Sequence, residues 1–271
     1  MTFPIRGILK LTATLLRRSW LPLTLVTLCL YLVPAWGIKF VQTLAFHSSW
    51  RGAFISDRGF GPAAWTLIVI SWLLHGFHMS AVTEIALRAA ASKPIRPRQL
   101  LLNAAVNAVP VLVTQFLLEV ILVTGGILLV VPGLYLGAAF SVVVPTYVCE
   151  GKNIPQAFRQ SFKLTKHRHL PIAGIWLVIF LIYGWASGSL LSIASLIEAN
   201  VQRLFPALSL PLLSLPEPMW PFFSTPVGMA LSTLVHQGIY VTLMVLNVTI
   251  YLGLRFHKTD SADNEVAAIF E

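Results

Sequence analysis

Long runs of apolar residues without charge constrain this chain more than any other feature. Ala63 to Thr83 is a run of 21 residues with no formal charge, and the 51 residues from Gln99 to Cys149 contain a single charge, Glu119. A helix needs about 20 mostly apolar residues to cross a membrane, because the hydrocarbon core is about 30 Å thick and the rise is 1.5 Å per residue. These runs predict an all-α fold, a polytopic membrane helical bundle.

The composition points the same way and bears on the partners of the chain. Only 11% of the 271 residues are charged and 56% are hydrophobic, whereas soluble domains carry about 25% charged residues. The net charge is +9, which in a soluble protein would favour nucleic acid as a partner. Because the basic residues fall between the apolar runs, we expect membrane lipids as their partners and no nucleic acid.

The hydropathy pattern predicts six transmembrane helices in a single integral membrane domain covering residues 1–271. The third and fourth share the run from Gln99 to Cys149, and Thr124-Gly125-Gly126 is the turn expected between them. The predicted spans are 19–40, 63–88, 100–123, 126–149, 170–197 and 227–254.

The distribution of Lys and Arg predicts the orientation of these spans. With the N-terminus inside, 15 basic residues fall in inner segments and 4 in outer segments. Loops that stay in the cytoplasm carry an excess of Lys and Arg. We therefore expect a multi-pass protein of the cell inner (plasma) membrane, with both termini in the cytoplasm.

Two inner segments, about 3–17 and 153–167, have apolar residues at helical spacing and basic residues elsewhere on the helix. Basic amphipathic helices lie in the headgroup plane and attract anionic lipids. These segments predict interfacial helices. The candidate lipid-binding residues of the second segment are Arg159, Lys163, Lys166 and Arg168.

A motif of about 35 residues runs from Val131 to Lys166. Its marks are Pro132-Gly133, Glu150-Gly151, Ala157, Ser161 and Leu164-Thr165. It resembles the glycerophosphoryl diester phosphodiesterase membrane-domain family and related uncharacterised bacterial inner-membrane proteins. The resemblance implies the membrane module alone, because the family's catalytic domain needs a barrel of about 250 residues with acidic metal ligands, and this sequence has only 10 acidic residues.

Several residues of this region have expected structural roles. Pro132-Gly133 predicts a kink in the fourth helix. Gly133 and Gly137 leave one helix face bare enough for close packing, as do Gly184 and Gly188 on the fifth helix. Glu150 is expected to cap the basic helix 153–167 or to pair with Arg159 or Lys163.

Polar residues inside the predicted spans are the other candidates for a functional site, because hydrocarbon makes them costly. His75 and His78 lie three residues apart and therefore on one helix face, and His236 and Asn247 lie on the sixth helix. No acidic residue or cysteine in the middle of the bilayer is expected to complete a metal site, so we predict neither a metal nor another cofactor.

The sequence contains no phosphate loop, nucleophile elbow or paired carboxylates. We therefore expect an integral membrane protein without catalytic activity, a membrane-organising or accessory module that interacts with lipids. The alternative is a small-solute transporter or channel with a polar centre of His75, His78 and His236. A membrane-protein partner or a homo-oligomer is left open.

Overall fold

A computed structural model describes residues 5–38, 55–56, 59–128, 130–151, 153–179, 181–182, 185 and 226–256. The described chain is helical apart from turns and a two-residue ladder in which β1 (Ile55–Ser56) pairs antiparallel with β2 (Gly59–Phe60). The predicted all-α class is confirmed. Five of the described helices are long and apolar enough to cross a membrane. They are Trp20–Ile38, Trp65–Ala90, Pro97–Gly125, Pro132–Glu150 and Thr233–Arg255.

These five helices correspond to five of the six predicted spans. The predicted span 170–197 begins in a shorter apolar helix, His169–Ile179, and most of its remainder lies outside the described residues. Gly184 and Gly188 also lie outside them.

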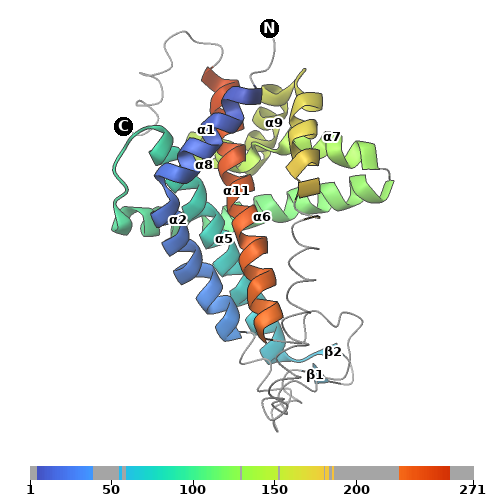
Figure 1. Cartoon of the computed structure of the whole chain (residues 1–271). Helices are drawn as coiled ribbons and strands as arrows, with labels where there is room; N and C mark the ends of the chain where they lie inside the picture. Colours follow the sequence, from blue (N-terminus) through green and yellow to red (C-terminus); the bar gives the residue numbers. More distant parts are fainter. Residues whose placement is uncertain are drawn as a thin grey trace, which may run out of the picture. The chain divides into compact units, whose positions relative to one another are not determined.

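The chain divides into two compact units, which are considered separately. The first contains Met1–Tyr31, Val69–Val178 and Val241–Glu271, and the second contains Leu32–Ile68 and Ile179–Tyr240. The first unit holds α1 (Ile5–Arg18), α2 (Trp20–Thr27) and most of α5 (Pro62–Ala90). It also holds α6 (Pro97–Leu128), α7 (Val130–Phe140), α8 (Val143–Glu150), α9 (Ile154–Thr165) and the last part of α11 (Pro226–Phe256) (Figure 1).

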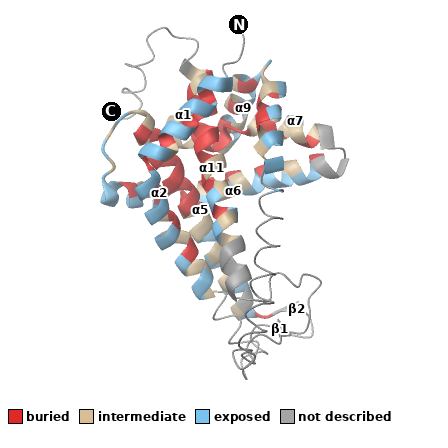
Figure 2. Ribbon diagram, in the orientation of Figure 1, coloured by how far each residue is buried: buried red, intermediate tan, exposed pale blue. Residues whose placement is uncertain are grey.

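The core of the first unit includes α5, which contacts α2 and α6, and α11, which contacts α1 and α8. Met79 to Ala86 of α5 and Val245 to Tyr251 of α11 are buried throughout (Figure 2). In contrast, α6 exposes a row of large apolar side chains that includes Val106, Val109 and Phe116. Exposed apolar side chains on a long helix are typical of a surface that faces lipid.

Helix α6 crosses α5 at Gly76 (Figure 1). A Cβ atom placed on Gly76 would lie 2.5 Å from the carbonyl oxygen of Ala108 and 2.9 Å from Cβ of Leu112. No side chain fits at this distance, so glycine is required for the two backbones to approach so closely.

The predicted turn at Thr124-Gly125-Gly126 is wrong, because α6 continues through these residues to Leu128. A glycine within a helix costs only about 1 kcal/mol relative to alanine. Gly125 is used for packing instead, since a Cβ atom there would lie 3.1 Å from Cα of Gly133 on α7. Gly137 lies on the same side of α7, where a Cβ atom would meet the side chain of Leu122 at 3.0 Å.

The fourth span is interrupted at Ser141-Val142, and the kink at Pro132-Gly133 stays a prediction. Helix α7 runs without a break through both residues, and the turn that separates it from α8 is at Ser141-Val142. Pro132 lies in the first turn of α7, where proline is tolerated. The ring of Pro145 would clash with the carbonyl group four residues earlier, that of Ser141, if one helix ran through. This clash accounts for the position of the break.

Candidate functional site

Helix α1 carries basic residues on the side that faces away from the bundle. Arg6, Lys10, Arg17 and Arg18 are exposed, whereas Ile8, Thr12 and Leu15 are buried. The buried side packs on α11, because the hydroxyl groups of Thr12 and Thr249 share a hydrogen bond of 2.7 Å. At the other end of α1, Arg18 donates a hydrogen bond to Ser92 in the link between α5 and α6.

Helix α9 has a basic face, a face of small buried residues and an aromatic edge between them. The sequence pattern identified the basic face and the apolar one, but not the face of small residues. Arg159 and Lys163 are exposed, and Lys166 follows directly after the helix. The face that packs against the bundle consists of the small residues Ala157, Ser161 and Thr165, which are fully buried. The aromatic edge between these faces includes Phe162, which is 40% exposed.

The small residues of α9 have a specific partner. The hydroxyl group of Ser161 donates a hydrogen bond of 2.9 Å to the carbonyl oxygen of Ala139, and the hydroxyl group of Thr165 is shared between this oxygen, at 3.0 Å, and the carbonyl oxygen of Ser161, at 2.9 Å. Ala139 lies in the last turn of α7, where carbonyl groups have no partner within the helix. The motif residues Ser161 and Thr165 thus supply hydrogen-bond donors to a carbonyl group that the helix break before Pro145 leaves without its helical partner.

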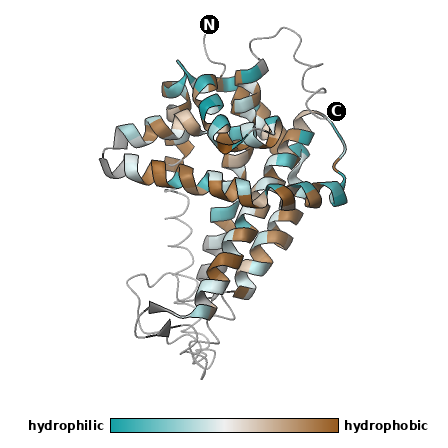
Figure 3. Cartoon of the chain, turned by 180° about the vertical axis from the view of Figure 1, so that it is seen from behind, coloured by the Kyte–Doolittle hydropathy of each residue, from teal (hydrophilic) through white to brown (hydrophobic). Residues whose placement is uncertain are grey.

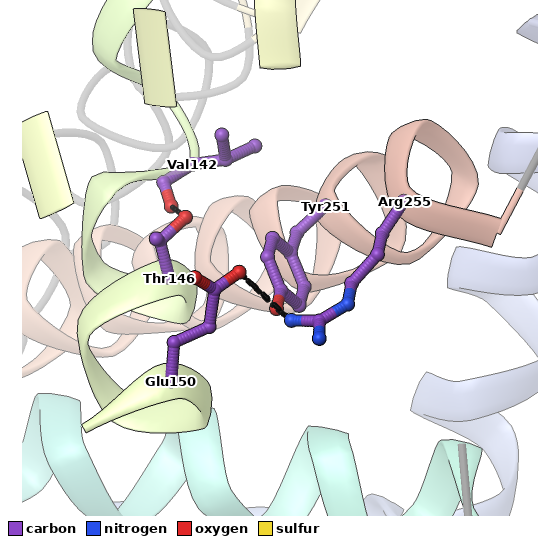
Figure 4. A network of polar contacts seen from close by, with 5 residues as sticks. All are labelled: Val142, Thr146, Glu150, Tyr251 and Arg255. Atoms are coloured by element: carbon purple, nitrogen blue, oxygen red, sulfur yellow. Dashed lines mark hydrogen bonds and ion pairs between the residues drawn. The ribbon is translucent and has the colours of Figure 1, made fainter. Parts of the chain in front are cut away.

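Glu150 ends α8 and joins it to α11. Its Oε1 atom accepts hydrogen bonds from the hydroxyl group of Tyr251 (3.0 Å) and from Arg255 (2.8 Å), as Figure 4 shows. Gly151 follows with φ of +58°, a left-handed conformation that favours glycine, and its N–H donates to the carbonyl oxygen of Tyr147. The Glu150-Gly151 pair of the motif therefore ends one helix and fixes it to another. Tyr251 and Arg255 were not predicted as partners of Glu150.

A second carboxylate joins α5 to α6. Oε1 of Glu84 accepts hydrogen bonds from Arg88 on its own helix and from Asn103 on α6, at 2.9 Å each. Arg88 also forms a salt bridge with this atom at 2.7 Å. Glu84 is 5% exposed, so this is a buried and well-satisfied carboxylate.

These contacts define the cationic face of the first unit, formed by exposed basic residues of α1, α9 and the residue that follows α9. Helix α1 is attached to the end of α11 through the hydrogen bond of Thr12 to Thr249. Helix α9 packs on α8, and α8 is attached to the same end of α11 through Glu150 and Arg255. Figure 3 shows hydrophilic residues gathered at this end. The members of the cationic face are Arg6, Lys10, Arg17, Arg18, Arg159, Lys163 and Lys166. Arg168, which was predicted as a lipid-binding residue of the second basic segment, is half-buried and is not counted in this face.

His75 and His78 lie on one face of α5, but their surroundings differ. Both rings contact the ring of Tyr31, with centroids 5.5 and 5.4 Å apart. His78 is fully buried, with Nε2 3.1 Å from the hydroxyl group of Thr27. His75 lines a pocket of about 260 Å³ together with Gln115 and Glu119 of α6. The sequence pattern assigned no site to these two α6 residues.

The two polar candidates of the sixth span lie in different units. His236 belongs to the second unit, where it is exposed and its ring stacks on Tyr240 with centroids 6.4 Å apart. Asn247 is buried in the first unit. The grouping of three histidines therefore stays a prediction. Among the described residues, no group of three or more His, Cys, Asp or Glu side chains is placed to hold a metal ion.

The fold and the long apolar helices define this chain as a helical membrane protein. Comparison with protein-family models, with curated proteins and with solved structures finds no match. The resemblance to the glycerophosphoryl diester phosphodiesterase membrane domain rests on the motif between Val131 and Lys166.

Proposed function

We propose that this protein is a non-enzymatic membrane module that binds anionic phospholipids through the cationic face. It lies in the cell inner membrane with both termini in the cytoplasm, an orientation that the excess of Lys and Arg in the inner segments supports. In this orientation the cationic face meets the cytoplasmic leaflet, whose anionic lipids attract basic segments.

One observation carries the proposal: the basic side chains of this face are exposed, while the nearby carboxylates form ion pairs with other arginines inside the bundle. Glu150 is paired with Arg255, and Glu84 with Arg88, and both carboxylates are largely buried. Neither therefore neutralises the exposed cations of α1 and α9. Phe162 and Leu170, at 40% and 84% exposure, place apolar surface beside the cations of α9, as expected of a helix in the headgroup region.

A transporter or channel for a small solute is the second candidate. The observation that favours it is the pocket beside His75, because polar residues within a membrane span often mark a substrate path. This candidate requires a path that continues from the pocket toward His78 and His236.

Native mass spectrometry of the full chain tests the first candidate. The protein in detergent is offered phosphatidylglycerol or phosphatidylcholine, and we expect it to retain the anionic lipid. The variant Arg159→Gln/Lys163→Gln/Lys166→Gln should bind it about tenfold or more weakly, because each cation contributes about 1 kcal/mol near an anionic surface. Analysis of the recovered lipid should show its headgroup and chains unchanged.

The matched control is Arg159→Lys/Lys163→Arg/Lys166→Arg, which keeps the charge and should bind as the native chain does. Equal retention of both lipids by the native chain, or unchanged binding by the Gln variant, would refute the proposal.

A further inference from the structure

The pocket beside His75 shares no residue with the cationic face, and binding of anionic lipid there does not account for the acidic, polar and aromatic residues that line it. It lies between α5 and α6, near their crossing at Gly76, and π-helix η1 (Leu28–Leu32) contributes Tyr31 to its wall. π-Helical turns are rare and occur frequently at functional sites. A volume of about 260 Å³ is slightly below the usual range for ligand pockets, so it admits a small group and not a large ligand.

Among the described residues that line the pocket, Glu119 is the only carboxylate, and none is Lys or Arg; His75 is the one other titratable residue with a basic side chain. Gln115, one turn earlier on α6, donates a hydrogen bond of 3.0 Å from Nε2 to Oε1 of Glu119. A carboxylate accepts up to about four hydrogen bonds. The structure gives Glu119 no basic partner within the described residues, so it differs from Glu84 and Glu150.

Gln115 supplies a second acceptor. Because its amide nitrogen faces the carboxylate of Glu119, its Oε1 atom is directed elsewhere, and this buried oxygen has no hydrogen-bond partner in the described structure. A buried acceptor without a partner costs about 1–3 kcal/mol. Both groups lie in a stretch of α6 that exposes apolar side chains to lipid, where a carboxylate without a counter-charge is expensive. A ligand that donates hydrogen bonds and carries positive charge would satisfy both.

Aromatic rings form the rest of the wall. Trp72 of α5 and Phe116 of α6 lie with ring centroids 5.8 Å apart, and the planes of the Tyr31 and His75 rings meet at 60°. The faces of aromatic rings carry negative potential and attract cations, with ammonium ions as the best-known ligands. The carboxylate, the free amide oxygen and the rings thus favour the same kind of group.

We propose that this pocket binds a protonated amine, an alkylammonium group whose N–H bonds reach Glu119 and Gln115 Oε1 while its carbon atoms contact Trp72 and Phe116. The same chemistry occurs in the ammonium headgroup of a phospholipid and in a free small amine. The inference is independent of the anionic lipids proposed for the cationic face.

Isothermal titration calorimetry of the full chain in detergent tests this with n-propylammonium chloride as the probe. We expect saturable binding, weaker binding of tetramethylammonium, which has no N–H bond, and no saturable binding of n-propanol or propionate. Glu119→Gln keeps the shape of the side chain and removes its charge, and it should weaken the binding of n-propylammonium about tenfold or more. Gln115→Leu should weaken it severalfold.

Thr124→Ala, which changes an exposed residue of α6 that does not line the pocket, is the control and should bind as the native chain does. A melting curve of the Glu119→Gln variant that matches the native curve excludes unfolding as the cause of weaker binding. Absence of saturable binding by the native chain, or native affinity in Glu119→Gln, would overturn the proposal.

Nanodiscs of stated composition distinguish the two sources of the amine. If phosphatidylethanolamine, but not phosphatidylcholine, displaces n-propylammonium, the ligand is a lipid headgroup. If the affinity for n-propylammonium is the same in both nanodiscs, the ligand is a free amine.

Discussion

Two regions of the first unit use carboxylates in opposite ways. At the helix junctions, Glu84 and Glu150 each accept hydrogen bonds from an arginine and from a second donor, and both are less than one-tenth exposed at the side chain. In the pocket, Glu119 is exposed, and among the described residues its hydrogen-bond partner is the neutral amide of Gln115, with no Lys or Arg paired to it. A carboxylate whose partners are supplied by the fold stabilises it, whereas one without a counter-charge is available to a ligand.

The contrast also distinguishes carboxylates that stabilise the fold, Glu84 and Glu150, from one that we propose binds a ligand, Glu119. Breaking a buried ion pair leaves an uncompensated charge and is strongly destabilising. Neutralising Glu119 leaves no cation unpaired. The two kinds of carboxylate therefore predict different outcomes for the same isosteric substitution, and three changes to the first unit test the comparison.

The largest effect is expected for Gly76→Ala, which acts on both regions at once. The added methyl group meets the backbone carbonyl of Ala108, so α5 and α6 must move apart at their crossing. Overpacking of this kind costs typically 1–3 kcal/mol, and we expect about 3 kcal/mol because the obstacle is backbone. Thermal unfolding in detergent, followed by circular dichroism, measures the change.

Gly174→Ala is the matched control, because no atom lies within 4 Å of a Cβ placed there and the residue is in a helix. Alanine favours the helix by up to about 1 kcal/mol, so this variant should unfold at the native temperature or above it. A Gly76→Ala variant as stable as the native chain would show that the helices do not cross as closely as described.

The isosteric series Glu84→Gln, Glu150→Gln and Glu119→Gln should produce three different changes in stability. We expect about 2 kcal/mol for Glu84→Gln, since it loses charged hydrogen bonds in a buried place. Glu150→Gln should cost about 1 kcal/mol, because Arg255 is one-third exposed at its side chain and regains solvation. Glu119→Gln should leave the free energy of unfolding unchanged or raise it, because it removes a carboxylate that has no counter-charge.

The order of these three changes is the decisive result, and chemical unfolding in mixed micelles measures it. If Glu119→Gln destabilised the chain as much as Glu84→Gln, the distinction between structural and available carboxylates would fail.

The smallest effect is expected at the attachment of α9. Replacing Ser161 by Ala and Thr165 by Val removes both donors to the carbonyl oxygen of Ala139, and we expect a loss of about 1 kcal/mol. Thr14→Val is the control, since its exposed hydroxyl group bonds only to the carbonyl of Lys10 within α1. The same unfolding measurements apply, and equal effects in the two variants would show that these hydroxyl groups do not anchor α9.

The sequence by itself determined that this is an all-α membrane protein with long apolar helices. That inference needs only length and composition, because every backbone polar group within hydrocarbon must be satisfied inside its own helix. It also identified the basic faces of α1 and α9 from helical spacing, and the shared face of His75 and His78. Each of these properties depends on residues close together in the chain.

The tertiary structure decided which side chains meet. Glu150 lies 105 residues from Arg255 and 101 from Tyr251, and the sequence contains no local signal for these pairs. The packing role of Gly125 likewise depends on where α7 approaches α6. The break at Ser141-Val142 depends on which residues donate hydrogen bonds to the carbonyl oxygen of Ala139. The same holds for the pocket, because Glu119 lines it together with His75 only where α6 lies against α5. The backbone N–H and C=O groups of a helix find hydrogen-bond partners a few residues away in the same helix, whereas a buried charged side chain needs a partner from another part of the chain.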